Sequence, residues 1–185
     1  MGVVSGISVT QFAAVILFFF LPFINVSCTG VLSTEVTGLQ FAAGGTIEFV
    51  EPISGQARRE TVEREPSATF ALAAAGAGAL LSLVPGLAAR LICAAAGIGG
   101  VALLLYLKSI IDDELSRQGQ GLIQVSYEFA FWGAVFLFAA AAATNAIASA
   151  GGVSSGRALR QSATILLLTF LVTVGAGVAI ARMLV

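Results

Sequence analysis

Five long stretches with almost no charge dominate this chain of 185 residues. The first reads FAAVILFFFLPFI at its centre, and the others contain long runs of Ala, Leu, Val and Gly. A helix needs about 20 apolar residues to cross the hydrocarbon layer of a bilayer. The predicted spans are residues 8–26, 67–84, 87–107, 128–148 and 163–182. The sequence therefore predicts an all-α transmembrane bundle of five spans in a single membrane domain.

The composition supports a membrane protein. Only 10% of the residues are charged and 58% are hydrophobic, whereas soluble domains carry about 25% charged residues. The formal net charge of -1 provides no basic surface for nucleic acid. We therefore expect the lipid bilayer as a partner, and no nucleic acid.

The sequence predicts no enzyme, cofactor or metal site. The chain has no histidine, so the usual zinc ligand, haem ligand and general base are absent. Cys93 lies in an apolar run and Cys28 at a loop edge, so we expect no disulfide between them. The acidic triplet 112–114 is a conceivable cation site, but a helix would point its members in different directions, which favours plain solvation.

A long polar segment, residues 27–66, separates the first two spans and holds six of the ten acidic residues. Residues 31–37 are rich in β-forming side chains and are predicted as a strand. A hairpin is predicted around Gly44-Gly45, between residues 39–41 and 46–50. The charged run 58–65 is interpreted as a solvated entry to a helix that starts near Pro66.

A second polar segment, residues 108–127, follows the third span. The helical pattern of that span continues to about residue 117, so we expect the helix to project beyond the membrane. Residues 122–128 then alternate between apolar and polar side chains, as in a strand. The sequence predicts a small extracytoplasmic antiparallel β-sheet formed from both polar segments.

Small residues recur at four-residue spacing in the apolar runs, where they let helix backbones approach closely. The residues predicted to pack against other helices are Gly78, Ser82 and Gly175. Tyr127 and Trp132 flank the start of the fourth span and are predicted to anchor it at the membrane interface.

The spans lack the charged residue near their centre that ion-coupled transporters usually need. Asn145 is interpreted as a polar contact between helices, with a substrate contact as the alternative. Glu128 is interpreted as a solvated carboxylate at the start of a helix.

The nature of the N-terminal apolar stretch and the orientation of the protein in the membrane leave alternatives open. A cleaved signal peptide, or a lipoprotein signal ending at Cys28, is the rival interpretation of the N-terminal stretch. The absence of Lys and Arg before the apolar run argues against both.

We expect a cytoplasmic N-terminus and an extracytoplasmic C-terminus, because the intervening cytoplasmic loops would then be short and purely basic. A raw count of basic residues favours the reverse orientation.

The segments LPFINVSC (21–28), TGLQFAAGG (37–45) and IQVSYEFAFW (123–132) together resemble uncharacterised small bacterial polytopic membrane proteins. The order of span, β-rich loop, two spans, shorter loop and span over residues 8–147 is similar in architecture to claudin-like tetraspan proteins. The first loop lacks Trp and has a single Cys, so the claudin loop signature is absent, and the fifth span is additional. The paracellular-barrier function of claudins is therefore not expected here. The excess of Arg over Lys and the abundant Ala and Gly suggest a bacterial source, and we expect the protein in the bacterial inner membrane.

From these features we expect a structural or accessory membrane protein. Its helices would pack against one another, against other membrane subunits or against a second copy, and its β-rich loop would dock a partner. A small oligomeric channel or transporter is the alternative. A polar stripe along one span would favour that alternative, and the spans show only scattered Ser, Thr and Asn.

Overall fold

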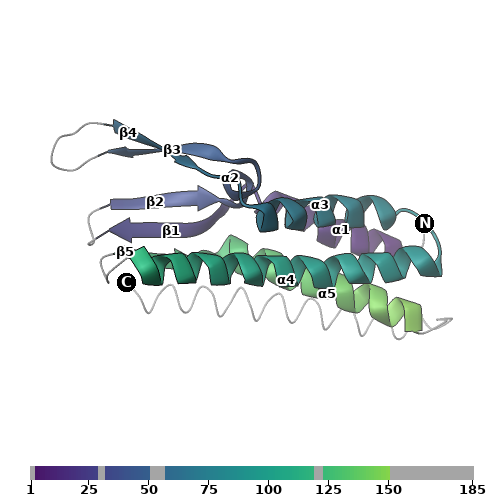
Figure 1. Cartoon of the computed structure of the whole chain (residues 1–185). Coiled ribbons are helices and arrows are strands. Elements are labelled where there is room, and N and C mark those ends of the chain that lie inside the picture. The colour runs from purple at the N-terminus through teal and green to yellow at the C-terminus, as the bar shows by residue number, and fades with distance from the viewer. Residues whose placement is uncertain (1–2, 29–31, 51–56, 119–122, 151–185) are drawn as a thin grey trace.

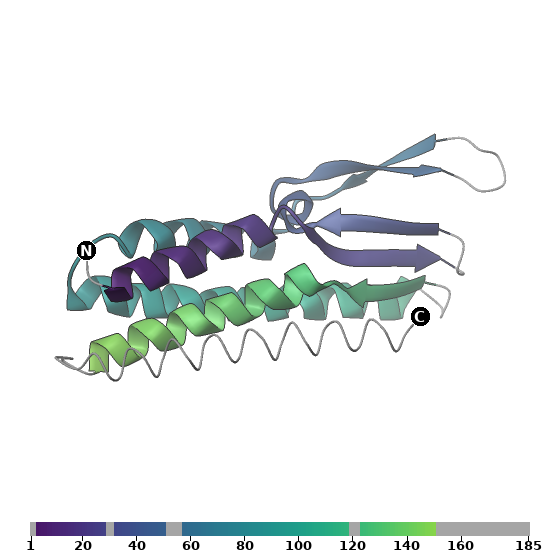
Figure 2. The ribbon, with the colours of Figure 1, turned by 180° about the vertical axis from the view of Figure 1, so that it is seen from behind.

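The computed structural model describes residues 3–28, 32–50, 57–118 and 123–150. Four long helices lie side by side, and the strands extend from one end of this bundle (Figures 1 and 2). The helices are α1 (Val3–Phe18), α2 (Gly38–Ala43), α3 (Pro66–Leu81), α4 (Leu87–Gln118) and α5 (Phe129–Ala150). The strands are β1 (Pro22–Cys28), β2 (Leu32–Thr37), β3 (Gly45–Val50), β4 (Ala57–Val62) and β5 (Ile123–Tyr127).

The first apolar run is a helix followed by a strand, so the prediction of one helical span over residues 8–26 is wrong. Helix α1 ends at Phe18, and turn hydrogen bonds carry the chain to Leu21. Pro22 then starts β1. Proline has no N–H to donate and its ring clashes with the preceding helical turn, so the helix cannot continue. The apolar residues after it serve instead in a sheet.

Strand β1 is the centre of a three-stranded antiparallel sheet in the order β2-β1-β5. Val26 pairs with Thr34 on one side and with Val125 on the other. The predicted strands at residues 31–37 and 122–128 are thus confirmed, as is a small antiparallel sheet that draws on both polar segments. Its central strand, however, comes from the residues assigned to the first span.

The predicted hairpin around Gly44-Gly45 is wrong. Residues 38–43 form the short helix α2, which is held by a capping box between Thr37 and Gln40. Gly44 follows with φ +80°, a left-handed conformation that glycine adopts without strain. Strand β3 begins directly after it and pairs with β4, not with residues 39–41.

The charged run 58–65 is also not a simple helix entry. Its first part lies in β4, which forms a two-stranded antiparallel sheet with β3. This sheet projects from the bundle on the side of β2 (Figure 1). Helix α3 then begins at Pro66, which occupies the first turn as predicted.

Helices α3 and α4 pack against each other as an antiparallel pair. The tight turn between them includes Gly86, whose φ of +144° favours glycine. Helix α4 has 32 residues, a length of about 48 Å at 1.5 Å per residue. Its last turns run beside the sheet (Figure 2). The predicted continuation of this helix to about residue 117 is therefore confirmed.

Five membrane spans are not supported by the described part of the chain. Two of its helices are long and apolar enough to cross a membrane by length and composition, namely residues Leu87–Glu114 and Phe129–Ser149. The apolar helices α1 and α3 have 16 residues each and are shorter. The predicted fifth span, residues 163–182, lies outside the described residues.

Aromatic rings fill the space beside glycines in the bundle core. A Cβ on Gly78 of α3 would lie 2.6 Å from the ring of Phe12 in α1. The Phe12 and Phe138 rings are both fully buried and meet edge to face, with centroids 6.2 Å apart. The interior is thus close-packed, and each ring occupies the space that a side chain at the glycine position would otherwise fill.

Candidate functional site: a buried polar network in the helix bundle

Polar side chains from three helices meet inside the apolar bundle, at the end remote from the sheet. Ser8 of α1, Ser82 at the C-terminal end of α3 and Asn145 of α5 are 1%, 6% and 2% exposed. Asn145 Nδ2 lies 2.8 Å from Ser8 Oγ, and Ser8 Oγ lies 2.8 Å from Ser82 Oγ. Buried polar groups need such partners, because an unpaired one costs about 1–3 kcal/mol.

The chemistry of the groups fixes the direction of this chain of hydrogen bonds. Ser82 Oγ donates its only proton to the Gly78 carbonyl oxygen, 2.6 Å away. Ser8 must therefore donate to Ser82, while it accepts from the Asn145 amide. The second amide hydrogen of Asn145 goes to the Ala141 carbonyl, 2.8 Å away. Both N–H groups of Asn145 are thus used.

The fourth helix joins through Cys93 of α4. Its thiol is 1% exposed and lies 3.5 Å from Ser82 Oγ and 3.6 Å from the Gly78 carbonyl oxygen. Because the Ser82 proton is already donated, the weak S–H donor can serve either oxygen. The network therefore links all four long helices at one level.

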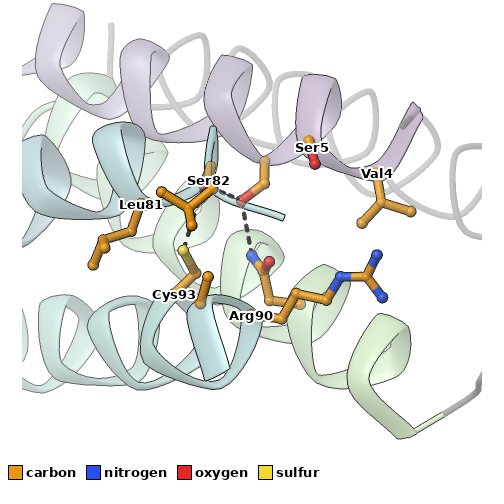
Figure 3. Close-up of a pocket in the computed structure, with 10 residues that line it drawn as sticks. Val4, Ser5, Leu81, Ser82, Arg90 and Cys93 are labelled. Carbon is orange, nitrogen blue, oxygen red and sulfur yellow. Dashed lines mark hydrogen bonds between the residues drawn. The ribbon is translucent and has the colours of Figure 1, made fainter. Parts of the chain in front are cut away.

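A small cavity lies beside this network (Figure 3). Its volume is about 10 Å³, close to the least that holds one water molecule. Ser5, Ser8, Ser82, Arg90 and Asn145 supply its polar lining. The hydrogen bonds found for Asn145 among the described residues use its Nδ2, and its Oδ1 is not one of their buried unpaired atoms, which are Gln11 Oε1 and Asn25 Oδ1.

Arg90 stands at the edge of the cavity and points toward the end of the bundle (Figure 3). Its Nη1 donates to the Ala148 carbonyl oxygen in the last turn of α5, at 2.9 Å. Cations favour this position, because helix C-termini carry partial negative charge. The acidic residues of the described ranges lie in the strands, at their junctions with the helices and in the last turns of α4, so none of them neutralises Arg90.

A second polar contact joins α1 and α5 next to the network. Gln11 Nε2 donates to Thr144 Oγ1 at 3.3 Å. The other amide atom, Gln11 Oε1, is buried and has no partner in the described structure. This unsatisfied acceptor is one turn from Ser8 along the same helix.

At the opposite end of the bundle, Tyr127 of β5 is bound to the projecting part of α4. Its hydroxyl donates to Asp112 Oδ1 at 2.7 Å and lies 3.2 Å from the Lys108 carbonyl oxygen. Lys108 also forms an ion pair with Asp112, and its Nζ stands 4.6 Å from the centroid of the Tyr127 ring. This cluster fixes the sheet to α4.

Burial raises the pKa of Tyr127 above its usual value, and the hydrogen bond to the negatively charged Asp112 raises it further. Ionisation would take the phenol proton out of that hydrogen bond and place two negative charges side by side. The hydroxyl therefore acts as a donor throughout the physiological pH range.

The structure places the residues singled out in the sequence as follows. Gly78 lies against Phe12, and Ser82 lies in the polar network. Gly175 lies outside the described residues. Tyr127 holds the cluster on α4, and Trp132 is 38% exposed and packs edge to face on Phe131.

Asn145 forms a polar contact with Ser8 of another helix, in agreement with its interpretation from the sequence as a polar contact between helices. The role of Ser8 was missed, as were those of Gln11, Arg90 and Cys93. The available signal was the presence of hydroxyl and amide side chains inside apolar runs, which must find partners when buried. Among the described residues, no group of three His, Cys, Asp or Glu side chains is placed to hold a metal ion.

No protein family, curated protein or solved structure matches this chain. The site must therefore be interpreted from its chemistry alone. Hydroxyl, amide and thiol groups fix helix positions, and Arg90 is the cation that the described residues place at this end, where one of its N–H groups is bonded to Ala148. This arrangement can hold helices in register and can bind a small polar or anionic group.

Proposed function

We propose that this chain is an integral membrane protein that acts as a structural or accessory subunit. Its helices cross the bilayer, and its β-strands project on one side, where they dock a partner. The observation that carries the proposal is the surface of the bundle, which is apolar and uncharged between two polar boundaries.

The large apolar side chains on this surface occur on all four long helices. Leu17 of α1, Phe70 of α3, Ile98 of α4 and Phe136 of α5 are 67%, 62%, 64% and 44% exposed. Soluble proteins rarely expose an apolar surface that extends over several helices. Lipid would cover these side chains and remove the cost of exposing them to water.

The spacing of the two boundaries fits a bilayer. On α4 the first charged residue, Arg90, is 18 positions from the next, Lys108, which corresponds to about 27 Å of helix. The hydrocarbon layer of a typical bilayer is about 30 Å thick. Turn hydrogen bonds extend α1 to Leu21 and α3 to Val84, so these shorter helices reach about 28 Å.

The further expectations from the sequence belong to this proposal. Residues 163–182 would form a fifth span. The protein would lie in a bacterial inner membrane, with its N-terminus in the cytoplasm and the sheets outside it. We propose no catalytic role, because the network consists of groups that lack a base to activate them.

Cysteine labelling tests the membrane arrangement. In a background of Cys28→Ser and Cys93→Ala, we would introduce Glu35→Cys in β2 or Pro85→Cys in the turn between α3 and α4. Both positions are exposed and lie at opposite ends of the bundle. A membrane-impermeant maleimide added to intact cells should label Glu35→Cys, and should label Pro85→Cys only after the cells are opened. Labelling of both from one side, or recovery of the protein in the soluble fraction, would refute the proposal.

Mass determination in native-like lipid particles tests the role as a subunit. A defined mass that includes another protein supports the accessory role. The charge-reversal variant Glu35→Arg should then lose that protein, while Pro85→Arg at the other end should retain it. A closed homo-oligomer of this chain alone would favour the alternative, a small channel or transporter whose pathway forms between copies.

A further inference from the structure

We propose that Arg90 and the cavity beside it form a binding site for the phosphate group of an anionic lipid headgroup. This inference rests on the proposed membrane location of the bundle. It adds a ligand, and a place for it, at the end of the bundle remote from the sheets.

The first argument is the state of the Arg90 side chain. Arg90 is partly buried, and within the described part of the chain one of its five N–H donors is used, by the Ala148 carbonyl oxygen at 2.9 Å. That hydrogen bond holds the side chain in place, so little further entropy is lost when an anion binds. A partly buried cation without a carboxylate needs a counter-charge, and a phosphate oxygen pair matches the guanidinium fork.

The second argument is the lining of the cavity next to Arg90. Ser5 contributes a hydroxyl side chain to this lining. Val4 and Ser5 lie in the first turn of α1, where backbone N–H groups have no helical acceptor. Both residues line the cavity, which therefore borders the start of a helix, the end that favours negative charge.

The third argument is size. A cavity of about 10 Å³ admits a water molecule or a hydroxyl group, but not a phosphate. The phosphate therefore lies at the mouth beside Arg90. A hydroxyl group of the headgroup, or a water, enters the cavity, whose polar lining includes Ser8, Ser82 and Asn145.

The fourth argument is depth. Arg90 is about 27 Å along α4 from Lys108, which places the two cations at opposite headgroup layers in the proposed arrangement. Lys108 is already paired with Asp112. Arg90, by contrast, faces the layer in which lipid phosphates are the abundant anions.

Lipid binding to the purified full chain tests the proposal. The chain in detergent would be titrated with phosphatidylglycerol or phosphatidylcholine, and bound lipid would be counted by native mass spectrometry. The variant is Arg90→Gln, which keeps an N–H donor for Ala148, and the matched control is Arg117→Gln on the same helix. We expect Arg90→Gln to bind phosphatidylglycerol about tenfold more weakly, because a charge-assisted hydrogen bond is lost. Arg117→Gln should bind as the wild type does.

Two further measurements distinguish a lipid phosphate from free phosphate, and a lost binding site from a folding defect. Arg90→Lys keeps the charge without the planar fork and should restore part of the affinity, which a mere folding defect would not. If inorganic phosphate alone displaces the lipid and stabilises wild type but not Arg90→Gln, the lipid assignment is overturned in favour of free phosphate.

Equal binding of phosphatidylglycerol by wild type and Arg90→Gln, or an equal loss in Arg117→Gln, would overturn the site itself. If cysteine labelling still shows the bundle crossing the membrane, then only this inference fails. If labelling contradicts a membrane arrangement, the proposed function fails first.

Discussion

At Gly97 the backbones of α4 and α5 come close together, and this position offers a sharp test of the packing. A Cβ at this position would lie 2.7 Å from the Phe138 carbonyl oxygen and 2.8 Å from the Ala142 backbone nitrogen. Ordinary contact begins at 3.4 Å, so the helices would have to separate by about 0.7 Å. Both neighbours are backbone atoms, and no change of side-chain rotamer relieves the clash.

The expected change in the free energy of unfolding for Gly97→Ala is the cost of overpacking minus the gain in helix propensity. Overpacking of a core typically costs about 1–3 kcal/mol. Alanine is favoured over glycine in a helix by about 1 kcal/mol. We therefore expect Gly97→Ala to lower the free energy of unfolding by up to about 2 kcal/mol.

Gly99→Ala is the matched control, two residues away on the same helix. A Cβ there meets nothing within 4 Å, so only the gain in helix propensity applies. Reversible unfolding in mixed lipid–detergent micelles, followed by the fluorescence of Trp132, the single tryptophan, would compare the two variants. If Gly97→Ala proves as stable as Gly99→Ala, the close contact of α4 and α5 is wrong.

Three other predictions use the same unfolding measurement or a spectrum. Asn145→Ala leaves Ser8 without its donor and should cost about 1–3 kcal/mol; an unchanged stability would show that the network is not formed. Tyr127→Phe removes the hydrogen bond to Asp112 and should cost about 1–2 kcal/mol, whereas an unaltered value would mean that the cluster does not hold the sheet. The raised pKa of Tyr127 adds stability that is complete below the unfolded value of 10.0 and is lost as the pH rises beyond it. Wild type should therefore lose stability relative to Tyr127→Phe above about pH 10, and its extra tyrosinate absorbance should appear only in that range.

The helices could be predicted where an apolar run was uninterrupted. Helices α3, α4 and α5 follow directly from such runs, because an uncharged run longer than a strand can satisfy its backbone only as a helix. Strand β5 was equally accessible, since its alternation has a period of two residues. Strand β1 was not, because its first residues continue the apolar run of α1. Ile24 and Val26 pair with residues of β5, about 100 residues away in the sequence.

Helix α2 was missed although its signal was present. Thr37 and Gln40 have the three-residue spacing of a capping box, but Gly44-Gly45 drew the prediction toward a hairpin. The polar network could not be assembled from sequence, because Ser8, Ser82 and Asn145 belong to different helices. Each could be recognised as a buried polar residue, but their meeting depends on how the helices pack.

The packing of the aromatic rings bears on the choice between the two proposed roles. Phe12 fills the space left by Gly78, and Phe138 fills the space left by Gly100. The two rings meet at the centre of the described bundle and are fully buried. A pathway for ions or solutes through that centre would require both rings to leave their glycines, at a cost comparable to emptying two core sites, about 3–5 kcal/mol each. A channel role would therefore need a pathway between copies, whereas a subunit role uses the bundle as it is packed.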